Sequence, residues 1–461
     1  MQTAIVLFTR DLRVHDHPAL SAAARDAERI VPLFVLDDRI LQTAFAQPNR
    51  VAFLRDALAD LDSSLAKRGA RLVLRSGDVV TETVRTAIEV RAEAIFMSHD
   101  VSGYAQARRQ RLMRACGEHR VALRLFPGIT IAEAGDVTTS SGTHFSVFTP
   151  FYRAWRQVPR RPLEQPPRRL VLPANVRLGR LPALERLVGG TVSPELPAGG
   201  ETEGRKRLTA TMRSGLGRYR QRNDDLAADA TSRLSPSLHF GCLSPLEVAE
   251  RAAGRPDAGS FVRQLAWRDF YHQLLDARPE TSHGDMRSRG DRWRKDEEGL
   301  AAWKEGRTGY PIVDAGMRQL LREGFIHNRA RMITASFLTK DLYVDWREGA
   351  SHYLDWLVDG DVANNSGNWQ WVAGTGADTR PNRVFNPIRQ ARKFDPSGEY
   401  VRRYVPELAE IGAGEVHEPW KLEGAQRARL DYPEPIVDHA EATSRFLRGR
   451  RRASGARAGR R

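Results

Sequence analysis

The chain has 461 residues, 41% of them hydrophobic and 28% charged, which predicts an ordinary globular protein of two or three domains and excludes a largely disordered one. No apolar run is long enough to cross a bilayer and no signal-peptide pattern precedes the first predicted strand, so we expect a cytoplasmic protein without membrane contact. Cys116 and Cys242 stand far apart without metal-ligand spacing, which argues against a disulfide framework and against a zinc or iron–sulfur site. The net charge of +15 favours a nucleic-acid partner, although arginine carries almost all of the excess and a GC-rich coding sequence alone would produce that bias.

Residues 1–130 alternate short apolar runs with helical patterns, which predicts a doubly wound α/β domain around a parallel sheet. Strands are expected at 4–8, 30–36, 71–74, 94–97 and 121–126, and helices at 18–25, 50–68, 81–90 and 105–119. No GxGxxG or GxxxxGK[ST] motif follows any of these strands, so neither a dinucleotide fingerprint nor a P-loop is expected.

The rest of the chain changes character three times. Residues 131–200 are rich in proline and poor in periodicity, as in an interdomain connector, although the aromatic stretch at 145–155 is expected to be docked. Residues 201–440 predict an all-α domain, with helical periods clearest at 261–276, 313–323, 328–341 and 351–358. Residues 441–461 are basic and are expected to form a disordered tail.

One stretch, residues 359–376, has a composition that suits neither an amphipathic helix nor a solvated loop, and it reads DGDVANNSGNWQWVAGTG. Asp359 and Asp361 indicate a backbone that turns its polar groups onto a ligand, and the WQW that follows indicates an aromatic wall. If this segment is helical, Trp369 and Trp371 lie about 200° apart and point to opposite sides. The alternative is a glycine-bounded loop whose tryptophans belong to the core.

Two predicted helices gather polar groups on one face. The first set lies at i, i+3, i+4 and i+7 and comprises Gln264, Trp267, Arg268 and Tyr271. The second set comprises Asn328, Arg331 and Met332. A buried arginine is costly unless it is paired, so Asp359 or Asp361 is the expected partner of Arg331. The alternative for both helices is a partly exposed face with ordinary arginines.

The segment TSRLSP at 231–236 places three hydroxyl groups around a proline. It predicts either a turn that cradles a diphosphate or a helix cap, and capping is the more frequent use of such residues. No metal-ligand cluster, Ser/His/Asp arrangement or pair of general-acid carboxylates stands at convincing spacing, so no metal is expected.

Several long motifs occur in order between residue 3 and about residue 408. They read DLRVHDHPAL, TSRLSPSLHFGCLSP, QLAWRDFYHQLL, WKEGRTGYPIVDAGMRQL, HNRARMITASFLTKDLYVDWREG and DGDVANNSGNWQWVAGTGADTRPNRVFNP. Together they resemble the DNA photolyases of the cryptochrome/photolyase family, and most closely the class I enzymes for cyclobutane pyrimidine dimers. The resemblance implies an antenna domain followed by a helical domain that holds FAD. It also implies light-driven electron transfer from reduced FAD to a dimer flipped out of damaged DNA.

The resemblance further implies a role for individual residues. Those that match the family's FAD contacts are Tyr219, Thr231, Ser232, Leu234, Ser235, Arg268, Asn328, Arg331, Asp359, Asp361 and Asn365. Those that match its substrate contacts are Gln264, Trp267, Asn328, Met332 and Trp371. The family's photoreduction chain matches Trp369 nearest the flavin, then Trp346, then Trp293 at the surface. By the same matching, Asn365 lies beside flavin N5, where photolyases carry Asn, which favours repair over signalling.

Two departures from the family pattern qualify these expectations. Gln264 stands where most class I dimer enzymes place a glutamate, as in (6-4) photolyases and several cryptochromes, and an amide cannot supply a proton. The alternatives are therefore a (6-4) photolyase or a cryptochrome-type photoreceptor. Tyr104, Ala105 and Gln106 replace the Asn-Glu pair of folate-binding relatives, so a deazaflavin antenna, or none, is favoured over methenyltetrahydrofolate. A monomer is expected.

Overall fold

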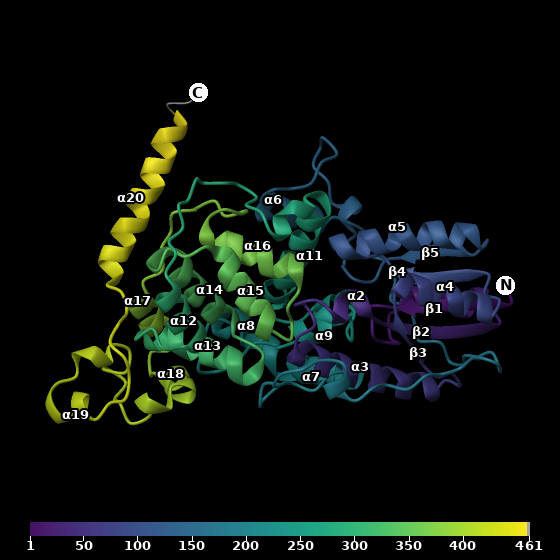
Figure 1. Cartoon of the computed structure of the whole chain (residues 1–461), viewed down its shortest axis with the longest axis horizontal. Coiled ribbons are helices and arrows are strands. Elements are labelled where there is room, and N and C mark those ends of the chain that lie inside the picture. Colours follow the sequence, from purple (N-terminus) through teal and green to yellow (C-terminus); the bar gives the residue numbers. More distant parts are fainter. Residues whose placement is uncertain (459–461) are drawn as a thin grey trace.

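The computed structural model describes residues 1–458, in which a sheet-containing part is followed by a larger helical part (Figure 1). Five parallel strands form one sheet in the order β3-β2-β1-β4-β5. The strands are β1 (Thr3–Phe8), β2 (Arg29–Asp37), β3 (Val73–Gly77), β4 (Ala94–Ser98) and β5 (Ala122–Phe126). The doubly wound α/β prediction is confirmed. The third strand lies a few residues later than predicted, because its pairing with β2 continues to Asp37 opposite Gly77.

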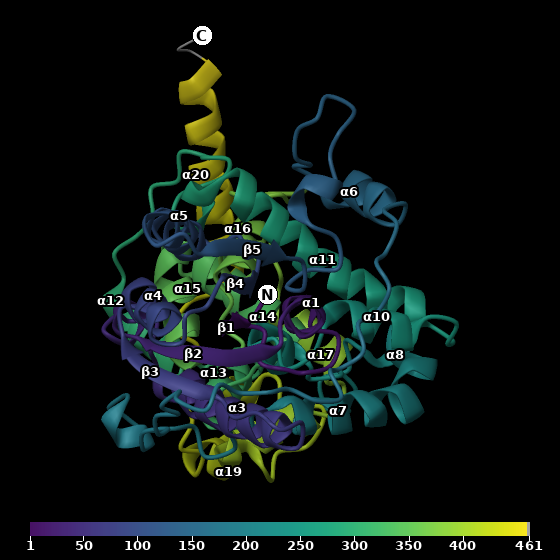
Figure 2. The ribbon, with the colours of Figure 1, turned by 90° about the vertical axis from the view of Figure 1, so that its right-hand side faces the viewer.

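Helices cover both faces of this sheet (Figure 2). They are α1 (Pro18–Asp26), α2 (Asp38–Leu41), α3 (Pro48–Ala66), α4 (Val79–Glu89) and α5 (Gly103–Glu118). Alternate residues of β1 point to opposite faces, as expected for a strand. Ala4, Val6 and Phe8 pack with α1 and α3, whereas Ile5 and Leu7 pack with α4 and α5. The α1/α3 side also contacts the helical part through Phe240.

The predicted connector is held against both parts of the molecule. Its short elements are η1 (Ala134–Asp136), α6 (Phe148–Trp155) and η2 (Leu184–Arg186). The backbone N–H of Leu74 in β3 donates to the carbonyl of Leu178 at 2.6 Å, so the connector runs along the sheet. The aromatic stretch forms α6, whose Phe148, Phe151 and Trp155 are buried in the same cluster as Phe270. The expectation that this stretch is docked is therefore confirmed.

The C-terminal part is helical, as predicted. Its first elements are α7 (Glu201–Ala210), η3 (Thr211–Gly215), η4 (Leu216–Arg218), α8 (Tyr219–Arg222), α9 (Ser235–His239), α10 (Pro245–Ala252), α11 (Ala258–Ala277), η5 (Pro279–Ser282), α12 (Glu297–Glu305) and α13 (Pro311–Glu323). Its later elements are α14 (Asn328–Ser336), η6 (Phe337–Asp341), α15 (Trp346–Trp356), α16 (Val362–Ala373), α17 (Pro387–Phe394), α18 (Glu399–Tyr404), η7 (Pro406–Leu408), η8 (Pro419–Lys421), α19 (Gly424–Ala428) and α20 (His439–Ala458).

The helix predicted at 328–341 changes geometry along its length. α14 ends at Ser336 and continues as the π-helical turn η6. Such turns occur where a side chain must be redirected. Here Lys340, which is 1% exposed, donates from Nζ to the carbonyl of Pro381 at 3.2 Å. Burial lowers the pKa of Lys340 from 10.5 to about 7.

The expectation of a disordered tail is wrong for the described residues, because α20 occupies 439–458 and runs along one end of the helical part (Figure 1). The prediction rested on the arginine content alone and did not recognise that Phe446 and Arg450 attach this segment to the helical part. Phe446 is fully buried, and Arg450 donates from Nε to Asp291 at 2.6 Å and from Nη2 to the carbonyl of Ala373 at 2.7 Å. These contacts stabilise a segment whose composition alone predicts disorder.

Among residues 1–458, no helix is long and apolar enough to cross a membrane. Within the same range no group of three or more His, Cys, Asp or Glu side chains could hold a metal ion. The division of the chain into 1–130, 131–200, 201–440 and a terminal segment stays a prediction.

Candidate functional site

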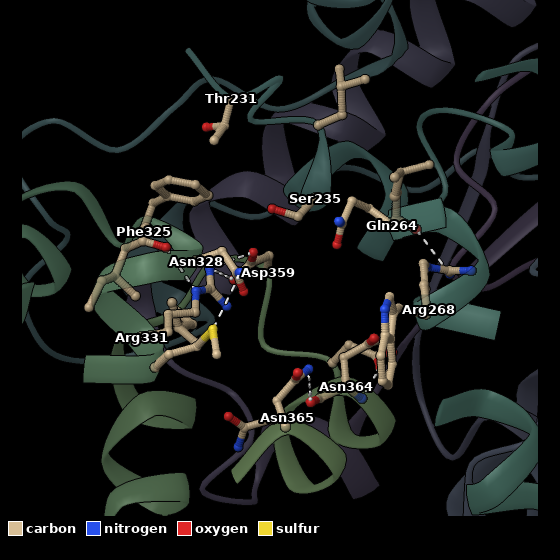
Figure 3. A pocket seen from close by; sticks show the side chains of 18 of the residues that line it. Thr231, Ser235, Gln264, Arg268, Phe325, Asn328, Arg331, Asp359, Asn364 and Asn365 are labelled. Carbon is tan, nitrogen blue, oxygen red and sulfur yellow. Dashed lines mark hydrogen bonds and ion pairs between the residues drawn. The ribbon is translucent and has the colours of Figure 1, made fainter. Parts of the chain in front are cut away.

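A cavity of about 530 Å³ lies in the helical part, between α11, α14, α16 and the loop before α9 (Figure 3). Sixteen of the eighteen residues to which the sequence assigns a role line it. They are Tyr219, Thr231, Ser232, Leu234, Ser235, Gln264, Trp267, Arg268, Asn328, Arg331, Met332, Asp359, Asp361, Asn365, Trp369 and Trp371. The exceptions are Trp346, which is 1% exposed in the core behind the cavity, and Trp293, which packs against that core from outside.

The polar face of α11 turns toward this cavity, as its spacing predicts. Gln264 and Arg268 come from successive turns of the helix (Figure 3). Arg268 donates from Nη1 to the carbonyl of Ile129 at 2.6 Å. Burial lowers the pKa of Arg268, and the carboxylate of Asp361 opposes that effect. Nη2 of Arg268 donates more weakly to the carbonyl of Leu238 at 3.5 Å. A guanidinium has five N–H donors, so Arg268 can still bind a further acceptor from the cavity.

Trp267 is held by a residue that sequence reasoning missed. Its ring stacks on Phe148 of α6 with centroids 3.6 Å apart and planes at 6°. Arg263 lies over the same Phe148 ring at 5.1 Å. The predicted connector therefore supplies one half of an aromatic wall at the cavity. The only signal for this contact was the aromatic density of residues 145–155.

Arg331 pairs with Asp359, which confirms the predicted partnership. Its Nη2 lies 2.8 Å from Asp359 Oδ2, and its Nε donates to the carbonyl of Ile326 at 2.8 Å. The Asp359 side chain is 4% exposed and that of Arg331 is 26% exposed. The pair joins α14 to the segment that precedes α16, so it defines one side of the cavity.

Asp361 has a different partner, Arg10, which lies 351 positions away at the end of β1. Arg10 donates from Nη1 to Asp361 Oδ2 at 2.6 Å and from Nη2 to Asp100 at 2.7 Å. The same Nη2 lies 3.0 Å from Nε2 of His272. Asp361 Oδ1 accepts from the backbone N–H of Asn364 at 2.8 Å and so caps α16. The sheet therefore holds the N-terminus of the helix that lines the cavity.

Charge–charge contacts keep this buried network ionised. Burial by itself would raise the pKa of Asp361, but His272 and Arg10 hold that pKa well below its usual range. Burial would likewise lower the pKa of Arg10, and Asp100 and Asp361 raise it above its usual value. The ion pairs thus offset a desolvation cost that neither partner would tolerate alone.

His239 makes the stability of the fold depend on pH. Burial lowers the pKa of His239 from 6.5 to about 4, and Asp361 opposes this shift. Because the folded pKa lies below the unfolded one, the contribution of neutral His239 is complete above pH 6.5 and is lost as the pH falls toward 4. Between pH 6.5 and pH 4 we expect the free energy of unfolding to fall more steeply with decreasing pH in the wild-type protein than in His239→Asn, by about 1 kcal/mol per pH unit. Urea unfolding at a series of pH values measures both slopes. Parallel pH profiles would contradict this assignment.

α16 carries the amide and indole groups of the stretch at 359–376. Asn365 donates from Nδ2 to the carbonyl of Ala350 at 2.9 Å, which leaves its Oδ1 toward the cavity region (Figure 3). Trp369 is 2% exposed and packs edge-on against Tyr353 at 4.9 Å. Trp371 is half-buried beneath Arg383, whose guanidinium lies 4.9 Å from the indole. Both indoles line the cavity, so the alternative of a loop with purely core tryptophans is wrong.

The segment 231–236 does not act as a helix cap. The N-cap position of α9 is Leu234, and no side chain accepts a hydrogen bond there. Thr231 Oγ1 is instead a buried lining atom without a hydrogen-bond partner among the described residues, and so are His239 Nδ1 and Trp369 Nε1. Since buried polar groups are nearly always paired, these three atoms indicate a polar ligand in the cavity.

Comparison with protein-family models gives two matches. Residues 4–168 match the family described as DNA photolyase, and residues 261–452 match the FAD binding domain of DNA photolyase. Among curated proteins, the chain is 53% identical to the deoxyribodipyrimidine photo-lyase of Streptomyces griseus over 98% of this chain and 99% of the relative. It is 37% identical to the protein of that name from Escherichia coli over 97% and 98% of the two chains.

Solved structures agree with this result. A bacterial class III photolyase from Agrobacterium tumefaciens superposes with a TM-score of 0.91 at 34% identity, covering 99% of this chain and 98% of that one. A cryptochrome from Synechocystis superposes with a TM-score of 0.89 at 29% identity, covering 97% and 99%. The fold is that of the photolyases, and the class I placement stays a prediction beside this class III neighbour. The arrangement of sheet, helices and cavity, together with these matches over nearly the whole chain, shows that the chain belongs to the DNA photolyase family.

Proposed function

We propose that this protein repairs cyclobutane pyrimidine dimers in DNA with light. The cavity, with its two indole walls and its unpaired polar atoms, is the observation that carries the proposal. Curated relatives of 53% and 37% identity are named deoxyribodipyrimidine photo-lyase, which supports the same activity here.

FAD fits the residues that line the cavity. The match to the FAD binding domain of DNA photolyase runs from residue 261 in α11 to residue 452 in α20, and the orphaned Thr231 hydroxyl could donate to a diphosphate oxygen of the cofactor. We assign the arginine pair to holding the flavin end, with Arg331 fixed by Asp359 and Arg268 fixed by Ile129. Bound reduced FAD supplies the electron that splits the dimer under light. The lining residues bind it, orient it and exclude water.

Trp267 and Trp371 form the walls for the flipped dimer in this proposal. Each indole is backed by an arginine, because Arg263 lies over Phe148, on which Trp267 stacks, and Arg383 lies over Trp371. Bases stack on such aromatic faces, and arginines beside them bind the flanking phosphates. A dimer pairs weakly and is cheaper to extrude than an intact base pair, which favours its capture. The remaining assignments to substrate are Gln264, Asn328 and Met332.

Repair itself is tested with purified, reduced protein and dimer-containing DNA under blue light. We expect the absorbance of intact pyrimidines to recover in the light and to stay constant in the dark. Bound FAD without any recovery would exclude repair and would leave the cryptochrome-type photoreceptor, an alternative that the similarity to the Synechocystis cryptochrome supports.

Gln264 is the observation that favours a second lesion, the (6-4) photoproduct. It lines the cavity from α11 (Figure 3). In Gln264→Glu, a protonated carboxyl group would donate a stronger hydrogen bond to the charged dimer than an amide does. We expect the ratio of dimer repair to (6-4) repair to rise about fivefold, which corresponds to roughly 1 kcal/mol. Assays of the two lesions side by side measure it, and an unchanged ratio would exclude a role for this position in lesion choice.

The identity of the antenna chromophore is proposed from the contacts of Tyr104 and Gln106. In the structure Tyr104 donates to Asp37, and Gln106 donates from Nε2 to Asp276 at 3.2 Å. These contacts engage the positions at which folate-binding relatives carry Asn and Glu, which supports a deazaflavin, or no antenna, over methenyltetrahydrofolate. The absorption spectrum of the purified protein separates these cases. A monomer that works in the cytoplasm on damaged DNA completes the proposal.

A further inference from the structure

Tyr343 stands between the predicted outer tryptophan and the C-terminal helix. Its ring lies 5.3 Å from that of Trp293, at an angle of 60°. On its other side it packs edge-on against Phe446 of α20, with centroids 5.7 Å apart. Tyr343 has φ of +58°, which is rare for a residue with a Cβ and is retained only where the surroundings hold it. Its side chain is thus fixed in contact with Trp293.

The phenol of Tyr343 is hydrogen-bonded to a carboxylate. Its hydroxyl donates to Asp291 Oδ1 at 3.0 Å, and the Asp291 side chain is 1% exposed. Arg450 of α20 donates from Nε to the same oxygen at 2.6 Å, while Asp291 Oδ2 is buried without a hydrogen-bond partner among the described residues. Burial raises the pKa of Asp291, although Arg450 opposes that effect, so its carboxylate takes up a proton more readily than an exposed one.

Two other tyrosines of the helical part also donate to a carboxylate, Tyr404 to Glu323 and Tyr432 to Asp314, but among the described residues neither ring packs against a tryptophan of the predicted chain. Tyr353 lies closer to the inner tryptophan, 4.9 Å from Trp369, but its hydroxyl meets only the hydroxyl of Thr334, which is no base at neutral pH. Tyr310 donates to the backbone carbonyl of Val437 at 2.8 Å. Because an oxidised phenol is a very strong acid, a tyrosine gives up an electron easily only when a base accepts its proton at once. Among Tyr353, Tyr310 and Tyr343, only Tyr343 has such a base.

We propose that Tyr343 is the final electron donor of this chain and that Asp291 accepts its proton. This rests on the proposed function and on the tryptophan chain that the family resemblance implies. In that chain Trp369, Trp346 and Trp293 would pass an electron inward to bound, photoexcited oxidised FAD, which would leave Trp293 as the outermost radical. The cation radical of Trp293 takes one electron from Tyr343, and the phenolic proton moves to Asp291 Oδ1. Trp293 returns to its neutral closed-shell form, Tyr343 becomes a neutral radical, and Asp291 becomes a neutral acid beside Arg450.

α20 supplies two of the residues that support this step. Recombination then requires the electron and the proton to return together, which lengthens the life of the charge-separated state and leaves time for an external reductant. Arg450 keeps Asp291 ionised and positioned before the step, and Phe446 holds the Tyr343 ring against Trp293. Arg450 and Phe446 are therefore positioning residues for this donor.

Flash photolysis of the protein with oxidised FAD tests the proposal through the absorption and electron paramagnetic resonance of the radical. We expect a tyrosyl radical in the wild-type protein, only a tryptophan radical in Tyr343→Phe, and an unchanged tyrosyl signal in the control Tyr310→Phe. In heavy water its formation should slow, and Asp291→Asn should suppress it. Tyr343→Phe keeps the ring packing, so it still tests whether Tyr343 is the radical site even if Asp291→Asn unfolds. The same tyrosyl signal in Tyr343→Phe would overturn the proposal.

A second measurement separates this proposal from the proposed function. A one-electron oxidant formed before mixing, tris(bipyridine)ruthenium(III), oxidises Trp293 from solution in the dark, so the flavin absorbs no light. We expect the tyrosyl radical again, and its loss in Tyr343→Phe but not in Tyr310→Phe. If the flavin flash produces no radical at all and the external oxidant still produces this pattern, the assigned tryptophan chain fails while the role of Tyr343 stands. Identical radicals in all three proteins would refute it.

Discussion

Replacing Asp361 by asparagine will lower the free energy of unfolding by about 3 kcal/mol and will release FAD, because the change leaves Arg10 as a buried cation with one partner fewer. The lost interaction is a close and buried ion pair, because Arg10 Nη1 lies 2.6 Å from Asp361 Oδ2 and the Asp361 side chain is 8% exposed. The asparagine keeps an oxygen that can cap α16, so the effect measures the charge and not the cap. Urea unfolding and the flavin absorbance retained after gel filtration are the measurements.

A matched pair on the surface provides the control for this experiment. Asp62 pairs with Arg71 at 2.7 Å, but the two side chains are 28% and 53% exposed. Exposed pairs of this kind contribute about 1 kcal/mol or less, so Asp62→Asn should change neither stability nor flavin content by much. Equal effects of Asp62→Asn and Asp361→Asn would show that the buried network does not hold α16.

Replacing Trp369 by phenylalanine will abolish the photoreduction of bound oxidised FAD, while chemically pre-reduced enzyme will still repair dimers. Trp369 lines the cavity, is 2% exposed, and has an indole Nε1 without a hydrogen-bond partner among the described residues. An indole is oxidised far more easily than a benzene ring, so phenylalanine fills the site but blocks the first electron transfer. Flavin absorbance under blue light with a thiol reductant measures photoreduction, and dimer repair by pre-reduced enzyme is measured separately.

Trp303 serves as the control for Trp369. It lies 6.0 Å from Trp369, is fully buried, and donates from Nε1 to the carbonyl of Thr334 at 3.0 Å, but it does not line the cavity. We expect Trp303→Phe to keep photoreduction. If Trp369→Phe loses photoreduction and repair to the same extent, the indole contributes to holding FAD and is not a dedicated electron donor.

The sequence predicted the residues of the cavity better than it predicted how they are held. The i, i+3, i+4 spacing placed Gln264, Trp267 and Arg268 on one face, and the structure brings that face to the cavity. The cost of burying a charge predicted a partner for Arg331, and Asp359 is that partner. The first inference succeeds because helical periodicity depends only on residues within a few turns of one helix. The second succeeds because a buried charged side chain requires a partner of opposite charge.

The same reasoning failed where a distant segment decides the local structure. The arginines of residues 441–461 predicted disorder, whereas α20 forms because Phe446 and Arg450 find partners on η6 and at Asp291. The TSRLSP segment favoured a helix cap on frequency, but its hydroxyls line the cavity and Leu234 occupies the cap position. Composition and residue frequencies describe the average behaviour of a segment, and they contain no information about the tertiary contacts that the segment makes in this fold.

By itself, the sequence determined the parallel sheet, the helical second part and the polar faces of two helices, because alternation and helical periods involve neighbouring residues. The other residues that surround the cavity followed from the resemblance of the motifs to the photolyase family. Only the tertiary structure decided that Arg10, in the loop after β1, anchors the cap of α16, that Phe148 packs behind Trp267, and that Tyr343 donates to Asp291. Arg10 and Asp361 are 351 positions apart, Phe148 and Trp267 lie in different segments, and no local pattern encodes such a pairing. These contacts form because folding buries charges and rings that are distant in the sequence, and buried polar groups require partners.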